Sequence, residues 1–135
     1  MTPLLVDSAY VIALVNDRDQ YHAQALRLAR RHRERPLVVT EGVLLEIGNF
    51  FSGSFRAQAA QIIEQFLTSP QVEVVYTSPQ LLASAIALYK RMSDKEWGLV
   101  DCISFVLMRE RGLTEALTPD HHFTQAGFQA LFTQR

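Results

Sequence analysis

The chain has 135 residues, with a hydrophobic fraction of 48%, a charged fraction of 20% and a formal net charge of -1 at pH 7. These values are typical of one globular domain with a proper core, so we expect residues 1–135 to form a single domain. They exclude a strongly basic nucleic-acid-binding protein, and no segment reaches the ~20 apolar residues that a membrane span requires. The lone cysteine, Cys102, excludes an internal disulfide framework and is typical of a reducing compartment. Because Asp7 interrupts the amino-terminal apolar run, we predict no signal peptide and expect a soluble, cytoplasmic protein with no membrane partner.

Short apolar runs, several of them rich in β-branched residues, alternate along the chain with stretches of helical apolar spacing. The runs predict strands at residues 4–6, 37–39, 72–76, 115–118 and, near the end of the chain, 130–132. The stretches between them predict helices at about residues 9–14, 21–33, 41–51, 55–67 and 99–111, and another that begins near Pro79. Strands that alternate with helices indicate a parallel sheet that is covered on both faces.

Two of the predicted strands lead into an acid: Asp7 follows the first strand, and Asp120 follows the fourth. These strands could be neighbours in one sheet, and the ligand sites of open α/β sheets collect at the carboxyl ends of the strands. Asp101 falls in the first turn of a predicted helix, and Glu46 falls within another. Ser8, directly after Asp7, is predicted to cap the helix that follows it.

The helix dipole alone can explain an acid at a helix start such as Asp101. It does not explain the set, because Asp7 and Asp101 lie among apolar residues and carboxylates are rarely buried without a partner. No basic residue is adjacent in sequence to Asp7, Glu46 or Asp101. Oxygen ligands without cysteine suit a hard cation, Mg²⁺ or Mn²⁺, and such an ion can activate water and stabilise charge in phosphodiester cleavage.

Several short segments carry these acids in a recognisable order. They are Leu5-Val6-Asp7-Ser8, a helix with Glu46, Leu99-Val100-Asp101-Cys102-Ile103-Ser104-Phe105, Leu117-Thr118-Pro119-Asp120-His121-His122-Phe123 and the closing Gln125-Ala126-Gly127-Phe128. Together the segments extend over nearly the whole chain and resemble a PIN domain. The acidic quartet of that family maps onto Asp7, Glu46, Asp101 and Asp120. Ser8 matches a hydroxyl that the family often has beside the first acid.

The resemblance implies an α/β fold in three layers, α/β/α, around a central parallel sheet of four or five strands. It implies a ribonuclease in which the quartet binds Mg²⁺ or Mn²⁺. Because the family includes VapC-type toxins, it also implies an RNA substrate, an antitoxin protein as partner and a homodimer. The apolar excess from Val43 to Phe55 is typical of such an interface. The chain departs from the family at Gly98 and Val100, where small hydroxyl residues are common.

The paired histidines and the arginine-rich segment allow two interpretations each. His121 and His122 could touch the substrate or assist proton transfer, or they could lie on a surface turn. The arginines of residues 27–35 could hold a phosphate backbone, or they could form a solvated helix face. Glu41 and Asp94 are explained as a helix-start acid and a solvated loop charge. Three aromatic residues are predicted to lie in the core: Trp97, Phe105 and Phe123.

Two alternative functions remain open on the sequence. A phosphoacceptor receiver domain also gathers acids at strand ends, but receivers have a lysine after the last strand. Here the only lysines, Lys90 and Lys95, precede Asp101. The other alternative is a non-catalytic PIN-like domain that binds RNA or a protein, which nuclease assays with and without metal would separate from an enzyme.

Overall fold

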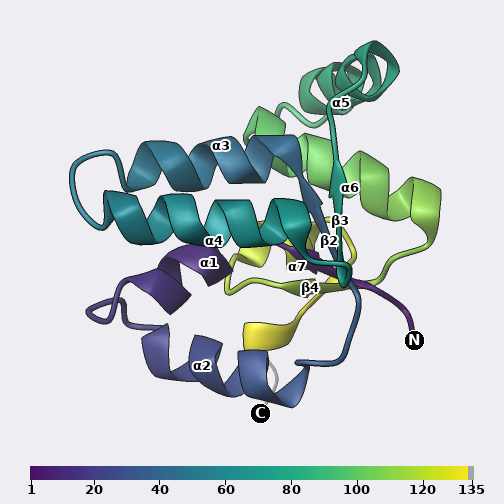
Figure 1. Cartoon of the computed structure of the whole chain (residues 1–135). Helices are drawn as coiled ribbons and strands as arrows, with labels where there is room; N and C mark the ends of the chain where they lie inside the picture. The colour runs from purple at the N-terminus through teal and green to yellow at the C-terminus, as the bar shows by residue number, and fades with distance from the viewer. Residues whose placement is uncertain (134–135) are drawn as a thin grey trace.

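The computed structural model describes residues 1–133, and within them five parallel strands form one sheet (Figure 1). The strands are β1 (Leu4–Val6), β2 (Leu37–Thr40), β3 (Val72–Val75), β4 (Glu115–Leu117) and β5 (Gln129–Ala130). Their order across the sheet is β3-β2-β1-β4-β5, so β1 is central and pairs with both β2 and β4. The predicted parallel sheet is thereby confirmed, as is the prediction that the two strands that lead into Asp7 and Asp120 are neighbours.

Helices cover both faces of this sheet and give the predicted three layers (Figure 1). The helices are α1 (Ser8–Val15), α2 (His22–Arg31), α3 (Glu41–Phe50), α4 (Arg56–Thr68), α5 (Pro79–Arg91), α6 (Leu99–Arg111) and α7 (His121–Gln125), followed by the 3₁₀ helix η1 (Leu131–Thr133). Within residues 1–133, none of the helices is both long enough and apolar enough to cross a membrane.

The central strand β1 divides the core because successive side chains of a strand point to opposite faces. Leu4 and Val6 pack into the core cluster on the side of α1–α4, whereas Leu5 packs into the cluster on the side of α5–α7. All three residues are fully buried. This burial on both faces explains why β1 is a continuous apolar run, as is typical of central parallel strands.

The last predicted strand is wrong over most of its length. Residues 130–132 were expected to be extended, but β5 ends at Ala130 and the chain turns into η1 at Leu131. Leu131 and Phe132 both pack into the cluster on the side of α1–α4, which consecutive residues of a flat strand cannot do. The predicted turn after Asp120 is the short helix α7.

Candidate active site

The predicted acids lie at the carboxyl edge of the sheet. Val6 pairs with Leu117 across the β1–β4 ladder, and the backbone N–H of Asp7 donates to the carbonyl of Leu117 at 3.3 Å. This register sets Asp7, the residue after β1, beside the chain that leaves β4 through Thr118. Asp120 follows two residues later as the N-cap of α7.

Asp7 is buried, with 4% of its surface exposed, and one neutral side chain satisfies it. The hydroxyl of Thr118 donates to Asp7 Oδ2 at 2.8 Å and accepts the backbone N–H of Asp120 at 3.0 Å. Thr118 therefore fixes the Asp7 carboxylate and the turn that carries Asp120 at the same time. The role of Thr118 was not predicted from the sequence, although a hydroxyl two positions before Asp120 at a strand end was a usable signal.

Asp101 lies in the first turn of α6 and accepts two hydrogen bonds at the same carboxylate oxygen. The backbone N–H of Gly98 donates to Oδ2 at 3.2 Å, and Nδ1 of His122 donates to it at 3.1 Å. Nδ1 of His122 also lies 3.5 Å from Asp120 Oδ1, so the half-buried ring bridges two of the acids. The two histidines therefore differ. His122 contacts the acids of the site, whereas His121 is exposed on the surface beside it.

Glu46 reaches the same edge from α3, and its partner is Ser8. The Ser8 hydroxyl lies close enough to the Glu46 carboxylate to oppose the rise of its pKa, and both residues line a hollow of ≈ 410 Å³ together with Ile12, Asn49 and Phe50. The predicted capping role of Ser8 is wrong, because Asp7 is the N-cap of α1 and Ser8 is the first helical residue. Asp7 caps without a side-chain hydrogen bond, since its carboxylate is held by Thr118 instead.

The four acids repel one another. The pKa of Asp7 is raised from 3.8 to about 7, chiefly by burial and, to a smaller extent, by the charges of Asp101 and Asp120, against the hydrogen bond from Thr118. Loss of hydration also raises the pKa of Asp101 and that of Glu46, and the charge of Asp120 adds to both increases. Within residues 1–133 no lysine or arginine forms an ion pair with any member of the quartet.

This donor set fits a divalent cation. Carboxylate oxygens are the ligands that hard cations prefer, and a cation would offset both the loss of hydration and the mutual repulsion that raise these pKa values. Ligand atoms of Asp120, His121 and His122 lie within 4.8 Å of one another, which adds nitrogen donors at the rim of the site. The residues that could hold the ion are thus Asp7, Asp101, Asp120 and, from α3, Glu46.

The remaining candidates lie elsewhere. Glu41 accepts the backbone N–H of Thr77 at 2.9 Å and so joins the start of α3 to the segment after β3. Asp94 forms an exposed ion pair with Lys95 at 3.2 Å. The arginines of residues 27–35 lie at the opposite, amino edge of the sheet. The predicted core aromatic residues are buried, namely Trp97, Phe105 and Phe123.

Comparisons with known proteins agree with this geometry. Residues 4–129 match the model of the PIN domain family. The chain is 30% identical over 126 residues to the 23S rRNA-specific endonuclease VapC20 of Mycobacterium tuberculosis, an alignment that covers 93% of this chain and 95% of that protein. The match to the PIN model decides against the receiver-domain alternative.

Two solved structures share the fold. The crystal structure of Mycobacterium tuberculosis VapC20, described as a sarcin-ricin loop cleaving toxin, superposes with a TM-score of 0.85 at 27% identity, over 93% of this chain and 95% of that one. The crystal structure of FitAcB from Neisseria gonorrhoeae superposes with a TM-score of 0.63 at 12% identity, over 94% of each chain, which shows a likeness of fold alone.

Proposed function

The chain belongs to the PIN domain family, and we propose that it is a divalent-metal-dependent endoribonuclease that hydrolyses RNA phosphodiester bonds. The observation that carries the proposal is the buried carboxylate of Asp7, set among three further acids without a lysine or arginine partner in residues 1–133. A folded chain has no structural reason to bury like charges together, since each raises the cost of the next. Binding of a cation would explain why these acids are grouped together.

We assign each acid a role in metal binding from the rigidity of the element that carries it and from its exposure. Asp7 and Asp101 stand on rigid elements, beside the central strand and in the first turn of α6, and we assign them as direct ligands of Mg²⁺ or Mn²⁺. A bound ion would activate water and stabilise the charge that develops on the scissile phosphate. Glu46 has the longer side chain and the more exposed position, so it would bind through water or orient the attacking water. Asp120 would complete the set from its turn.

Three neighbouring side chains would keep these acids in position. Thr118 fixes the orientation of the Asp7 carboxylate, and His122 links Asp101 to Asp120. Ser8, which lies near Glu46, would orient that carboxylate from α1. Hydrogen-bond partners of this kind usually change metal affinity or activity 10–100-fold when removed. They also supply hydrogen bonds to the acids although Gly98 and Val100 carry no hydroxyl groups.

We further propose that the protein is the toxin of a toxin–antitoxin pair, as its homology to VapC20 indicates. The antitoxin would cover the acidic site and insert a basic side chain, and arginine matches paired carboxylates best. The absence of a lysine or arginine partner for these acids in the described part of the chain supports this mode. A crosslinked or solved complex with the partner on the amino edge of the sheet would contradict it. A cytoplasmic location, predicted from the sequence, belongs to this proposal.

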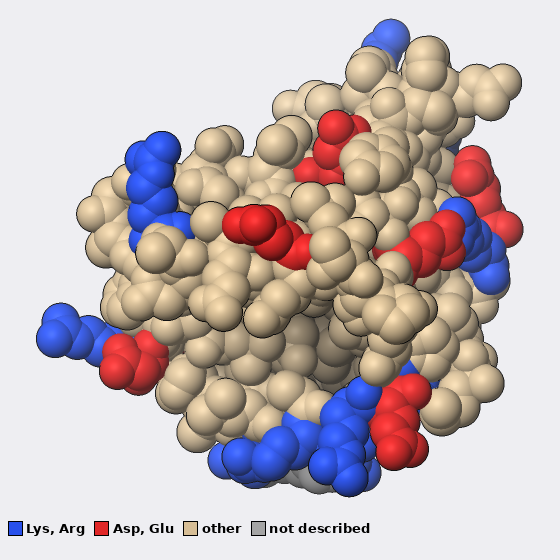
Figure 2. All heavy atoms as spheres, in the orientation of Figure 1, with Lys and Arg blue, Asp and Glu red and all other residues tan. Residues whose placement is uncertain are grey.

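A homodimer is the second part of the assembly proposal. Phe51 is buried, but Leu45 and Phe50 expose 62% and 58% of their surface on α3, and Phe55 and Leu67 expose 37% and 49% beside it. Figure 2 shows this face, over α3 and α4, as mostly tan, with separate acidic and basic side chains between the uncharged ones. Exposed apolar patches usually mark interfaces. Light scattering of the wild type at micromolar concentration should give a dimer mass, and a monomer mass would remove this claim.

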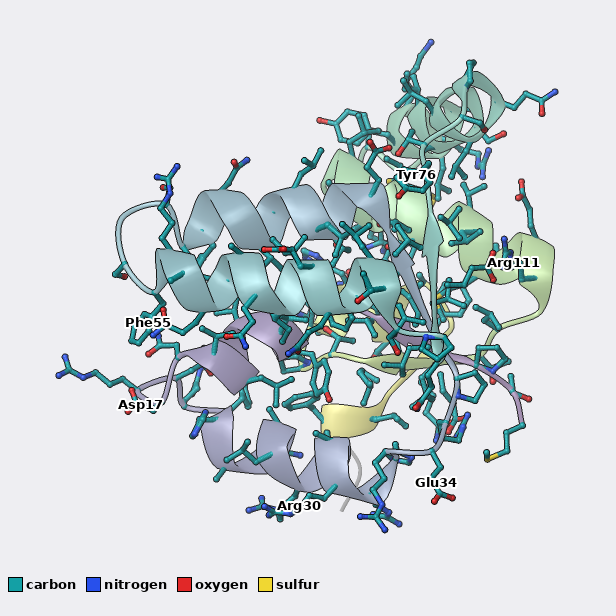
Figure 3. The ribbon with its side chains drawn as sticks, in the orientation of Figure 1. Asp17, Arg30, Glu34, Phe55, Tyr76 and Arg111 are labelled. Atoms are coloured by element: carbon teal, nitrogen blue, oxygen red, sulfur yellow. The ribbon has the colours of Figure 1, made fainter. Side chains whose placement is uncertain are left out.

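One experiment tests the central proposal. Purified protein is incubated with RNA in the presence of Mn²⁺, with a chelator, and as the Asp7→Asn variant, which keeps the side-chain shape and removes the charge. Cleavage should require both the metal and Asp7, and the exposed loop variant Asp17→Asn serves as the matched control (Figure 3). A folded wild type that cleaves no RNA with Mg²⁺ or Mn²⁺ would favour the non-catalytic PIN-like alternative.

A further inference from the structure

A second hollow of ≈ 490 Å³ lies between the end of α5 and the start of α6. It is lined by Tyr89 and Lys90 from the last turns of α5 and by Lys95, Trp97 and Gly98 from the connection to α6. Figure 1 shows α5 and α6 packed at the upper end of the molecule, away from α2. None of the residues of this hollow has been assigned a part in cleavage, although Gly98 donates its N–H to Asp101 at 3.2 Å.

Gly98 therefore connects the hollow directly to the acidic site. A Cβ atom added to Gly98 would meet no atom within 4 Å, so the space beside this residue is open. Because Gly98 both lines the hollow and donates its N–H to Asp101, the hollow and the acidic site are adjacent at this residue. The hollow is thus placed to hold the part of the strand next to the cleaved bond.

The charged lining suits a phosphate backbone. The chain contains two lysines, Lys90 and Lys95, and both line this one hollow. Lys90 is exposed, and Lys95 is tied only to Asp94, its neighbour in sequence, in a surface ion pair of the weak kind. Glu96 is the single acid among the lining residues, so the lining carries a net positive charge beside an acidic site. A positive surface beside the acidic site favours binding of a polyanion, such as RNA, that extends beyond the metal ligands.

The aromatic lining suits a base. Tyr89 exposes 51% of its surface, so one side of its ring is accessible to a base. Trp97 is only 5% exposed, and its Nε1–H donates to Gln125 Oε1 at 2.9 Å, so the indole forms a fixed wall. Exposed aromatic rings next to basic side chains are the common arrangement for binding single-stranded nucleic acid, because every base can stack on them.

We propose that this hollow is a nucleotide subsite for single-stranded RNA, in which Lys90 and Lys95 hold phosphate and Tyr89 stacks on a base next to the cleaved bond. The inference rests on the proposed ribonuclease function, which it deepens by naming where the strand leaves the acidic site. Its test therefore measures binding separately from cleavage.

The binding test uses a fluorescent single-stranded RNA and the Asp7→Asn protein, so that the RNA stays intact. Lys90→Gln/Lys95→Gln should weaken binding about tenfold and lower the slope of log K against log salt by about 1.4, since each phosphate contact on a single strand contributes ~0.7. The matched control is Arg30→Gln/Arg31→Gln, which removes the same charge at the opposite edge of the sheet and should leave the slope within ~0.3 of the parent. Equal losses in both double variants would show that only net charge matters and would overturn the subsite.

Substitutions at Tyr89 provide a second test of the subsite, because they leave the net charge of the protein unchanged. Tyr89→Leu should weaken RNA binding about tenfold, whereas Tyr89→Phe should bind like the parent because the ring that stacks is kept. Tyr76→Leu removes another exposed tyrosine outside the hollow and should have no effect (Figure 3). If Tyr89→Leu also binds like the parent, the stacking assignment fails. If wild-type protein cleaves RNA while the lysine variants bind and cleave equally well, the subsite fails and the ribonuclease proposal stands.

Discussion

The two edges of the sheet carry opposite charges in opposite settings. At the carboxyl edge, Asp7 is buried and the pKa values of three acids are raised by loss of hydration. At the amino edge, exposed arginines surround a hollow of ≈ 320 Å³ that Arg30, Arg31 and Arg33 help to line. The largest group of basic side chains in Figure 2 lies there, at the lower end of the view over α2.

The difference shows that burial, rather than the density of charge, marks the functional edge. The arginines are closer together in sequence than the acids, but water and salt screen their repulsion. Arg35, the most buried of them, is paired with Glu115 at 3.0 Å and donates to the carbonyl of Thr2. The acids have no such partners among the lysines and arginines of residues 1–133. The predictions below test whether this contrast holds, from the largest effect to the smallest.

The largest effect should come from Asp7→Asn. Loss of a charged ligand should reduce RNA cleavage at least 10³-fold, about the size of losing a central electrostatic contribution to catalysis. The melting temperature of the metal-free protein should stay the same or rise, because the substitution removes a buried like charge. Cleavage assays and thermal denaturation measure the two quantities. Wild-type cleavage, or an unfolded variant, would show that Asp7 is not a metal ligand.

The acids should differ among themselves. Asp101→Asn should abolish cleavage like Asp7→Asn, because Asp101 is held in the first turn of α6, where its charge acts on Asp7. Asp120→Asn should keep more residual activity, since Asp120 lies on a turn after Pro119 where the backbone adjusts more easily. Initial rates of RNA cleavage with Mn²⁺ rank the variants. A lower rate for Asp120→Asn than for Asp101→Asn would reverse the assignment of direct ligands.

Stability of the metal-free protein should depend on pH through Asp7. Its pKa is about 7 when folded and near 3.8 when unfolded, so the unfolded chain loses its proton first as pH rises. The free energy of unfolding should therefore fall as pH increases from about 4 to 7, by up to about 4 kcal/mol, and level off above. Denaturant titrations at several pH values, repeated with Asp7→Asn, measure this slope. The slope should shrink in the variant and on addition of Mn²⁺, and an unchanged slope in both would contradict the assignment.

Thr118 tests the hydrogen bond that makes the burial of Asp7 tolerable. Thr118→Val keeps the shape but leaves the Asp7 carboxylate and the Asp120 N–H without this partner. Unfolding free energy should fall by about 1–3 kcal/mol at neutral pH, and cleavage should fall 10–100-fold. Thr118→Ser keeps the hydroxyl and should restore most of both, as chemical denaturation and cleavage rates would show. A failure of Ser to restore activity would mean that Thr118 acts through packing alone.

Much of the fold and the acidic set could be predicted from the sequence because each depends on local pattern. Apolar runs that end in an acid identify β1 and its edge, and the helix spacing of α6 identifies Asp101 as a first-turn residue. The parallel order followed from the alternation of strands and helices. These features need no knowledge of which residues meet across the fold.

The contacts that support the acids could not be predicted, because they join distant segments. The Thr118–Asp7 hydrogen bond spans 111 positions and exists only through the β1–β4 register. The His122–Asp101 bond depends on how α7 packs beside α6, and the lysine hollow depends on how the α5–α6 connection folds back. Ser8 was assigned as a cap because its partner Glu46, on α3, is not local.

The smallest effect should come from the amino edge. Arg30 and Arg31 lie in the last turn of α2, where a cation interacts favourably with the helix dipole, so Arg30→Gln/Arg31→Gln should lower the free energy of unfolding slightly. We expect a loss of less than about 1 kcal/mol at low ionic strength, and we expect it to vanish near 1 M salt, where the screening length is about 3 Å. RNA cleavage should stay at the wild-type rate.

Denaturant titrations at the two salt concentrations measure the first effect, and the Asp7→Asn protein measured in parallel shows how a buried charge behaves under the same screening. A salt-independent loss of several kcal/mol would mean that the arginines make specific stabilising contacts. The difference between buried acids at one edge and screened arginines at the other would then not hold.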